Sequence, residues 1–315
     1  MPRLLRQAVH DPEMILTVTL NASLDVSYSV ERLSDGEPVR VRDVSMRPGG
    51  KGINVAMVLA ALGTDVTATG LAGGHRGELI RERLAWTEVN DALVPIAAES
   101  RQTVVAVADD GSFAEYDERG TGVSAEDWEG FLAVYRQLLD RCATVVCAGS
   151  LPGDIPDTAY ATLVCIAHDR GRTVVLDAGG PALVAGIEAG PDVVKVNRAE
   201  LAALVGAESV EAAVNDFAER TGGTVIVTSG SSGAIAAGDG WRYRVRPPAR
   251  SGNPVGAGDA FTAGLLADSL AGAAPTERLA FATAIAASAV GMPCAGTVDL
   301  GLAKELLDRV EVEPW

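Results

Sequence analysis

Short, almost continuously apolar runs rich in β-branched residues recur along the chain, as in strands that are buried on both faces of a parallel sheet. They lie at residues 14–20, 66–71, 103–108, 144–148, 173–177, 192–196 and 224–228. Segments with the helical spacing of apolar residues lie between them, at 53–62, 78–86, 125–139, 157–168, 199–204, 210–220 and 259–270. This alternation predicts an α/β fold with a parallel central sheet.

Two regions, residues 26–46 and 101–116, break this rhythm. Both alternate apolar and polar residues at period two, and they contain the Asp-Gly turns Asp35-Gly36 and Asp110-Gly111. The pattern predicts a small antiparallel sheet with one solvated face. Because both regions are inserted between α/β units, we expect this sheet, called the lid below, to fold over the carboxyl edge of the main sheet, where such folds bind ligands.

The charge balance excludes several classes of partner. The chain has 26 Lys and Arg residues against 42 Asp and Glu residues, which gives a formal net charge of −16. An acidic surface repels phosphodiester backbones, so we expect no nucleic-acid binding and no polybasic membrane attachment. No apolar stretch reaches the roughly 18 residues that a membrane helix requires.

The amino-terminal segment and the cysteines indicate the cellular compartment of the protein. Residues 1–13 show neither an apolar period nor a secretion signal, so we expect a disordered extension ahead of a single domain over 14–315. No C-x-x-C pair occurs, and apolar neighbours favour buried, reduced thiols over disulfides or metal ligands at Cys142, Cys147, Cys165 and Cys294. These features together predict a cytoplasmic protein.

A glycine-rich segment, residues 47–56 with the sequence RPGGKGINVA, lies where a strand-rich region meets a predicted helix. Glycines let a ligand approach the backbone closely, and the start of a helix offers free N–H groups to an anion. The alternative interpretation is a tight loop that happens to be rich in glycine. The segment is not a Walker A loop, because its spacing does not match that motif.

A second glycine motif near the carboxyl end carries more chemical information. Gly256, Ala257 and Gly258 lead into a predicted helix with Asp259 in its first turn. The N–H groups and the helix dipole can hold a phosphoryl group in transfer, and a carboxylate beside them can accept the proton of an attacking hydroxyl. The alternative is that Asp259 caps the helix.

The two motifs together resemble the amino- and carboxyl-terminal signatures of the PfkB, or ribokinase-like, family of sugar kinases. The resemblance covers residues 14–310 and includes the segments 21–25, 149–152, 195–200 and 228–233. It implies a ribokinase-like three-layer α/β/α sandwich with a small antiparallel β lid. The segments 148–152 and 100–104 resemble the branch that contains 1-phosphofructokinase, tagatose-6-phosphate kinase and the minor 6-phosphofructokinase. Residues 116–120 are more charged than their usual counterpart in that branch.

The resemblance also implies roles for individual residues. Asp259 would be the general base, with Gly256, Ala257 and Gly258 as the anion hole. Sugar hydroxyls would be held by Asp25, Gly50 and Asn54, and Gly49 and Lys51 would also belong to the substrate site. The phosphate already on the sugar would be held by Arg101 and Ser150, assisted by Arg40 or Arg42, for which a solvated position on the lid is the alternative. ATP would be bound by Lys195, Asn197, Glu200, Ser229, Gly230 and Gly233. Asn197 and Glu200 would also lie near Mg²⁺, with a solvated first helical turn as the alternative for Glu200.

From these roles we predict ATP-dependent phosphorylation of a sugar phosphate, with fructose 1-phosphate converted to fructose 1,6-bisphosphate. Alternative acceptors are tagatose 6-phosphate, fructose 6-phosphate, a free sugar or a nucleoside. An alternative of another class is a non-catalytic regulator that binds a sugar or a nucleotide. A lid sheet with one open apolar face needs a partner, so we also expect a homodimer through the lid.

Overall fold

The computed structural model describes residues 14–120, 122–205, 209–270 and 272–315, and the predicted extension 1–13 lies outside them. The strands are β1 (Met14–Thr19), β2 (Ser23–Val30), β3 (Val41–Gly49), β4 (Val66–Gly73), β5 (Asn90–Ile96), β6 (Arg101–Ala108), β7 (Phe113–Asp117), β8 (Cys142–Ala148), β9 (Thr173–Asp177), β10 (Val193–Asn197), β11 (Thr224–Thr228), β12 (Ala234–Gly238), β13 (Trp241–Arg246) and β14 (Glu311–Pro314). The helices are α1 (Lys51–Ala61), α2 (Gly74–Leu84), α3 (Ala125–Leu138), α4 (Ala159–His168), α5 (Gly180–Glu188), α6 (Arg198–Val205), α7 (Val210–Thr221), α8 (Ala257–Leu270), α9 (Pro275–Ala289) and α10 (Leu300–Leu307).

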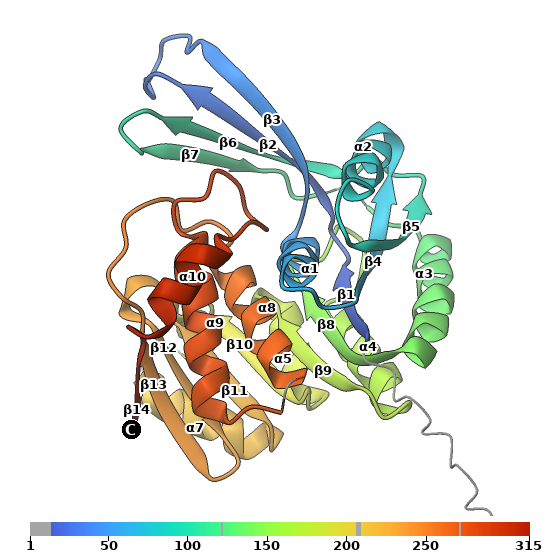
Figure 1. The fold of residues 1–315 in the computed structure, drawn as a ribbon. Helices are drawn as coiled ribbons and strands as arrows, with labels where there is room; N and C mark the ends of the chain where they lie inside the picture. Colours follow the sequence, from blue (N-terminus) through green and yellow to red (C-terminus); the bar gives the residue numbers. More distant parts are fainter. Residues whose placement is uncertain (1–13, 121, 206–208, 271) are drawn as a thin grey trace, which may run out of the picture.

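A ten-stranded sheet forms the centre of the molecule, in the order β14-β13-β12-β11-β10-β9-β8-β1-β4-β5 (Figure 1). The strands from β5 to β11 pair in parallel, as the apolar runs predict. Strands β12, β13 and β14 continue the sheet with antiparallel pairing, so the expectation of a purely parallel sheet is wrong at this end. The connections β11–β12 and β12–β13 are too short for a parallel crossover, which explains the change of direction.

Helices cover both faces of this sheet and create a core on each. Strand β1 is continuously apolar because both of its faces are buried. Leu16 and Val18 pack into one core, and Ile15 packs into the other. The first core contains side chains of α3, α4, α5, α6 and α7. The second contains side chains of α1, α2, α8, α9 and α10. The predicted three-layer α/β/α fold is thus confirmed.

The lid is the separate four-stranded sheet β3-β2-β6-β7, which projects from the body (Figure 1). Its two hairpins, β2–β3 and β6–β7, are antiparallel as predicted, but β2 and β6 pair in parallel. The fully antiparallel lid that the period-two pattern predicts is therefore wrong at this one pair. Strands β2 and β6 follow the parallel strands β1 and β5, so both leave the carboxyl edge of the main sheet in the same direction.

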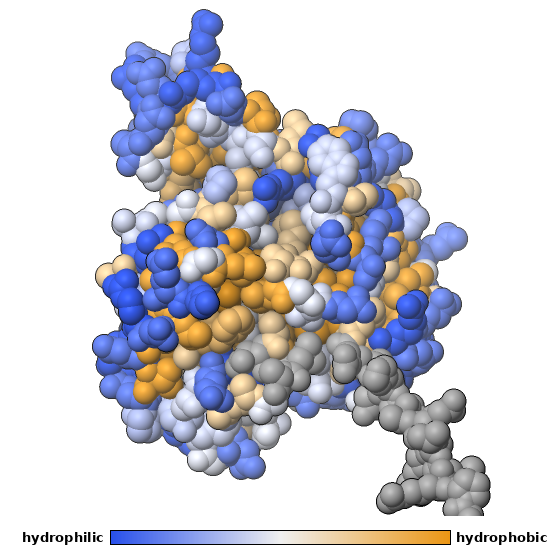
Figure 2. Space-filling model, in the orientation of Figure 1, coloured by the Kyte–Doolittle hydropathy of each residue, from blue (hydrophilic) through white to orange (hydrophobic). Residues whose placement is uncertain are grey.

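The surface of the lid is unevenly polar. Its tip is covered by hydrophilic residues (Figure 2), while Val44 on β3 and Tyr116 on β7 are 54% and 66% exposed. Val41, Met46 and Phe113 are also exposed. Along the described ranges of the chain, no helix combines the length and the apolar character that crossing a bilayer would need.

Candidate active site

A cavity of about 880 Å³ lies where the lid meets the carboxyl edge of the central sheet. Its floor includes Thr19, Asn197 and Thr228, which end β1, β10 and β11. Helices α1 and α8 begin at its wall, and β2, β6 and β7 contribute the lid side. Both glycine motifs therefore reach one cavity, although they lie near opposite ends of the chain.

The first glycine motif joins β3 to α1 in close contact with Asp25. A Cβ atom added to Gly49 would lie 2.1 Å from the Asp25 carboxyl carbon, and Gly50 has a φ of 101° that disfavours other residues. Both positions require glycine, because a side chain on Gly49 would displace Asp25 and one on Gly50 would meet the Thr19 methyl group at 2.6 Å. Gly50 lines the cavity, whereas Gly49 lies behind its wall against that carboxylate.

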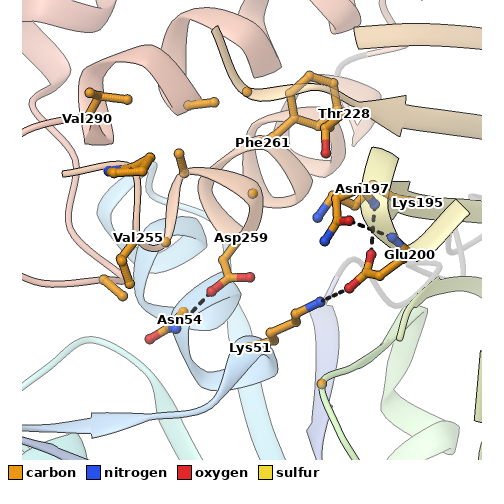
Figure 3. Close-up of a pocket in the computed structure, with 18 of the residues that line it drawn as sticks. Lys51, Asn54, Lys195, Asn197, Glu200, Thr228, Val255, Asp259, Phe261 and Val290 are labelled. Atoms are coloured by element: carbon orange, nitrogen blue, oxygen red, sulfur yellow. Dashed lines mark hydrogen bonds and ion pairs between the residues drawn. The ribbon is translucent and has the colours of Figure 1, made fainter. Parts of the chain in front are cut away.

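Asp259 is a buried carboxylate in the first turn of α8. Its Oδ2 accepts a hydrogen bond of 2.8 Å from Asn54 Nδ2 on α1 (Figure 3). Burial and the nearby charge of Asp177 raise the pKa of Asp259 to about 6, although Lys51 and Lys195 oppose the shift. A carboxylate with such a pKa is ionised at neutral pH and is basic enough to accept a proton.

The start of α8 can receive an anion. Gly256 has a φ of 81°, and a Cβ atom there would lie 2.7 Å from Ala295, so this turn depends on glycine. A Cβ atom on Gly258 would lie 3.0 Å from Lys195 Nζ, which places an ammonium group beside the same turn. In the first turn, the N–H of Ala257 donates to Pro254 O and that of Ala260 to Gly256 O. The remaining N–H groups of this turn and the lysine together form a positive site.

Asp177, at the end of β9, lies between two lysines of the site, Lys51 and Lys195. Its Oδ1 is 3.1 Å from Lys51 Nζ, and its Oδ2 is 2.8 Å from Lys195 Nζ and accepts from Thr262. Burial disfavours its ionised form, but Lys195 and Lys51 outweigh burial and lower its pKa to about 2. The sequence motifs did not indicate Asp177 as part of the site. The available signal was an acidic residue directly after the apolar run 173–176, at the edge where ligands bind.

Asn197 and Glu200 form a reciprocal pair at the start of α6. The Asn197 N–H donates to Glu200 Oε2 at 2.7 Å, and the Glu200 N–H donates to Asn197 Oδ1 at 2.8 Å. Lys51 Nζ reaches Glu200 Oε1 at 3.2 Å (Figure 3). Glu200 is thus held in place at the cavity wall, in contrast to the alternative of a freely solvated side chain.

The far end of the cavity is largely apolar and lies between β11, α8 and α9. Phe261 and Val290 line it, with the buried hydroxyl of Thr283. Gly230 and Gly233 also line it, whereas Ser229 lies next to Gly230 outside the cavity wall, where its N–H donates to Gly233 O. A flat, apolar molecule with a polar edge would fit this end.

The lid side of the cavity is polar. Asp25 accepts a hydrogen bond of 2.5 Å from Ser23 Oγ, and burial raises its pKa to about 6. Arg101 is paired with Asp117, and its Nε donates to Asn21 O at 3.0 Å. Ser150 lies beside them, because its Oγ accepts from Asn21 Nδ2 at 3.0 Å.

Most of the sequence-predicted residues therefore line one cavity. Gly49 and Ser229 lie just outside its wall, and the two lid arginines Arg40 and Arg42 lie farther away. Arg40 and Arg42 lie on the exposed part of the lid, and Arg42 is 2.5 Å from Asp109. Neither lines the cavity of its own chain.

Comparison with known proteins agrees with this arrangement. A model of the pfkB family carbohydrate kinases matches residues 18–299. A possible 1-phosphofructokinase from Thermotoga maritima is 28% identical, with a TM-score of 0.89, over 96% of this chain and 99% of that one. Phosphofructokinase-2 from Escherichia coli, in complex with fructose 6-phosphate, is 26% identical, with a TM-score of 0.86, over 94% and 98% of the two chains. A ribokinase from Thermotoga maritima shares the fold, with a TM-score of 0.75. It is 19% identical, over 94% of this chain and 99% of that one.

The resemblance to sugar kinases found in the sequence is thereby confirmed. The family match extends over both glycine motifs and the residues between them, and the two phosphofructokinases align over nearly their full length. The chain belongs to the pfkB family of carbohydrate kinases, which are phosphotransferases with an alcohol group as acceptor.

Proposed function

We propose that this protein transfers the γ-phosphoryl group of ATP to a hydroxyl of a small sugar phosphate, and that fructose 1-phosphate is converted to fructose 1,6-bisphosphate. The observation that supports this most is the position of Asp259. This buried carboxylate lies at the positive start of α8, in the same cavity as the lid arginine Arg101. The single cavity thus offers a base, an anion site and a cation for a substrate phosphate.

The proposed step is an in-line displacement. The acceptor oxygen forms a bond to the γ-phosphorus while the bond to the bridging oxygen of ADP breaks, and the hydroxyl proton passes to Asp259. A positioned base of this kind contributes roughly 10²- to 10⁴-fold to the rate. The Asn54 amide hydrogen-bonds Oδ2 of Asp259 and so orients the carboxylate.

The positive groups of the site match the charge that the step must stabilise. The N–H groups of Gly256 and Gly258 would bind the oxygens of the transferring group, and Lys195 lies beside them. The N–H of Ala257 donates to Pro254 O in this structure and would have to leave that acceptor to join them. Lys51 is held between Asp177 and Glu200, so it is fixed before a ligand arrives. Such preorganised charges lower the barrier because they need no reorganisation during transfer.

Mg²⁺ would accompany ATP and neutralise charge on its phosphates when bound. Asn197 and Glu200 are the residues proposed to hold it. Both Glu200 carboxylate oxygens already accept hydrogen bonds from the protein, which fits contact through water. Mg²⁺ commonly keeps several waters and few protein ligands.

The nucleoside of ATP would occupy the apolar end of the cavity. Phe261 and Val290 offer apolar surface there, and the buried Thr283 Oγ1 has no hydrogen-bond partner among the described groups. A purine has an apolar face and polar edges, so both features suit it. Ser229, Gly230 and Gly233 would lie next to it.

A second candidate acceptor is an unphosphorylated sugar. The observation that favours it is the acidity of the lid side, where Asp25, Glu115 and Asp117 all line the cavity. Like charges oppose the binding of a phosphate dianion. This candidate keeps the same base and the same donor and differs only in the acceptor.

The lid also supports a proposed homodimer. The exposed apolar side chains of Val44, Met46 and Tyr116 lie on a sheet with an open face. A second copy of the lid would bury them. Arg40 and Arg42 would then lie close to the dimer contact rather than in the cavity of their own chain.

A coupled assay of ADP release tests the proposed function. The acceptors are fructose 1-phosphate, fructose 6-phosphate, tagatose 6-phosphate, ribose and adenosine, each with ATP and Mg²⁺. We expect the highest kcat/KM with fructose 1-phosphate. A higher kcat/KM with ribose or adenosine would replace the sugar phosphate with a neutral acceptor, and binding without turnover across the whole panel would favour a non-catalytic regulator.

A further inference from the structure

Arg101 is already bound to an internal anion in this structure. Its Nη1 donates to Asp117 Oδ1, and the same carboxylate oxygen accepts from Thr103 Oγ1 at 2.9 Å. Only 10% of the Arg101 side chain is exposed, against 61% of the Asp117 side chain. The arginine that faces the acceptor thus has its charge balanced by a carboxylate from the next strand of the lid.

The rest of the Arg101 guanidinium is anchored independently of Asp117. Nε donates to Asn21 O at 3.0 Å, and Nη1 also lies 3.3 Å from Glu118 O. Among the described contacts, Nη2 donates to no group. Loss of the Asp117 contact would therefore leave the guanidinium in place and open to a different anion.

The charges around Arg101 determine how easily an anion can enter the lid side of the cavity. Among the described lid residues that line the cavity, Arg101 is the one cation, and it faces the carboxylates of Asp25, Glu115 and Asp117. Burial, followed by the charge of Asp117, raises the pKa of Glu115. A phosphate group entering this side must replace Asp117 at Arg101 and also overcome its repulsion.

We propose that Asp117 is an exchangeable counter-ion of Arg101 and that it sets how tightly the acceptor site binds phosphate. The proposal rests on the proposed function, in which Arg101 receives the phosphate of the acceptor sugar. Asp117 keeps the arginine paired while the site is empty and discriminates against weakly bound anions. Its large exposure and its position on β7, at the edge of the lid sheet, let the carboxylate move to solvent when a sugar phosphate arrives.

Asp117 acts through Arg101 and is therefore a positioning residue. Three variants separate its effect from a general effect of lid charge. Asp117→Asn removes the counter-ion but keeps the size of the side chain. Asp109→Asn removes an equal charge from an exposed lid pair with Arg42, away from the cavity. The double variant Arg101→Ala/Asp117→Asn removes the arginine through which the effect must act.

The measurement is the dissociation constant of fructose 1-phosphate, of fructose and of inorganic sulfate, by titration calorimetry. We expect Asp117→Asn to tighten the binding of fructose 1-phosphate and of sulfate roughly two- to fivefold, as for one partly exposed charge contact. Fructose and the KM for ATP should change less than twofold. Asp109→Asn should bind like the wild type, and the tightening should vanish in the double variant.

The sulfate titration keeps this proposal separate from the proposed function. A wild type that turns over ribose but no sugar phosphate refutes the proposed acceptor, while tighter sulfate binding by Asp117→Asn still supports the counter-ion. Unchanged or weaker binding of both anions by Asp117→Asn overturns the counter-ion proposal. Tightening that persists in the double variant overturns it as well, because the effect would not act through Arg101.

Discussion

The side chains of Asn54 and Asp259 are joined by a hydrogen bond of 2.8 Å, although 205 positions separate them in the chain. This bond connects the first turn of α1, which follows one glycine motif, to the first turn of α8, which follows the other. The Asn54 amide donates to the ionised form of Asp259 and therefore lowers its pKa. Any change at Asn54 should therefore be measurable as a change in the pH dependence of activity.

We predict that Asn54→Asp shifts the acid limb of the kcat/KM profile, which reports the pKa values of the free enzyme, to higher pH. Asp259 must be ionised to accept a proton, so wild-type activity should rise with pH through a midpoint near its pKa of about 6. A second carboxylate at residue 54 disfavours ionisation of Asp259, which raises that pKa further. The kcat/KM of the variant should fall more at pH 6 than at pH 9. An unshifted acid limb would argue against Asp259 as the group that titrates.

Asp177→Asn should destabilise the protein strongly. The carboxylate is fully buried between Lys51 and Lys195, so the substitution leaves two ammonium groups without their shared counter-ion. The cost of breaking a buried ion pair is about 3–5 kcal/mol. Urea unfolding at pH 7 measures it, with Asp216→Asn as the control, because Asp216 forms an exposed pair with Arg220 worth under about 1 kcal/mol.

The pH dependence of that difference has a defined sign. Because the folded-state pKa of Asp177, about 2, lies below its ordinary value of 3.8, the folded state binds protons less tightly than the unfolded chain. The stabilisation is present above about pH 4 and is lost as pH falls toward 2. The wild type and Asp177→Asn should therefore approach each other in stability below pH 3. A difference that stays constant down to pH 2 would contradict the assignment of the pair.

The lid should mediate association. Val44→Glu and Tyr116→Glu place charges on exposed apolar positions of β3 and β7, and neither residue belongs to the core. We expect light scattering at micromolar concentration to give a dimer mass for the wild type and a monomer mass for both variants. Trp86→Glu is a suitable control, since Trp86 is 68% exposed and lies outside the lid. A monomeric wild type, or a control that also dissociates, would contradict the lid contact.

Strong periodicity allowed much of the fold to be predicted. The apolar runs of β1, β4 and β8 to β11 are buried on both faces, and a helix with amphipathic spacing follows most of them, so both signals agreed. Strands β12 and β13 were not predicted, because alanine, glycine and arginine dominate their sequences. Strand β5 begins with Asn90 and Asp91 and contains Pro95, residues that suit the edge of a sheet.

The residues of the site that belong to local sequence motifs could be predicted. The glycines of both motifs are clustered in the sequence, and the structure shows that larger side chains would clash at these positions. Asp177 belongs to no such motif, and its position after an apolar run does not identify its partners. Lys51 and Lys195 are 126 and 18 positions away, and only the fold brings them together. The pairing of Arg101 with Asp117 likewise depends on the register of β6 and β7, which a period-two pattern does not specify.

The central claim is that Asp259 is the base of a sugar kinase, and replacing it by asparagine tests that claim most directly. Asparagine can still accept the hydrogen bond from Asn54, so the geometry of the two helices is kept while the proton acceptor is lost. With fructose 1-phosphate, ATP and Mg²⁺ at pH 8, we predict that kcat of Asp259→Asn falls roughly 10²- to 10⁴-fold with little change in either KM. A kcat within a few-fold of the wild type would contradict the claim and leave Asp259 with a structural role, the hydrogen bond that joins α8 to Asn54.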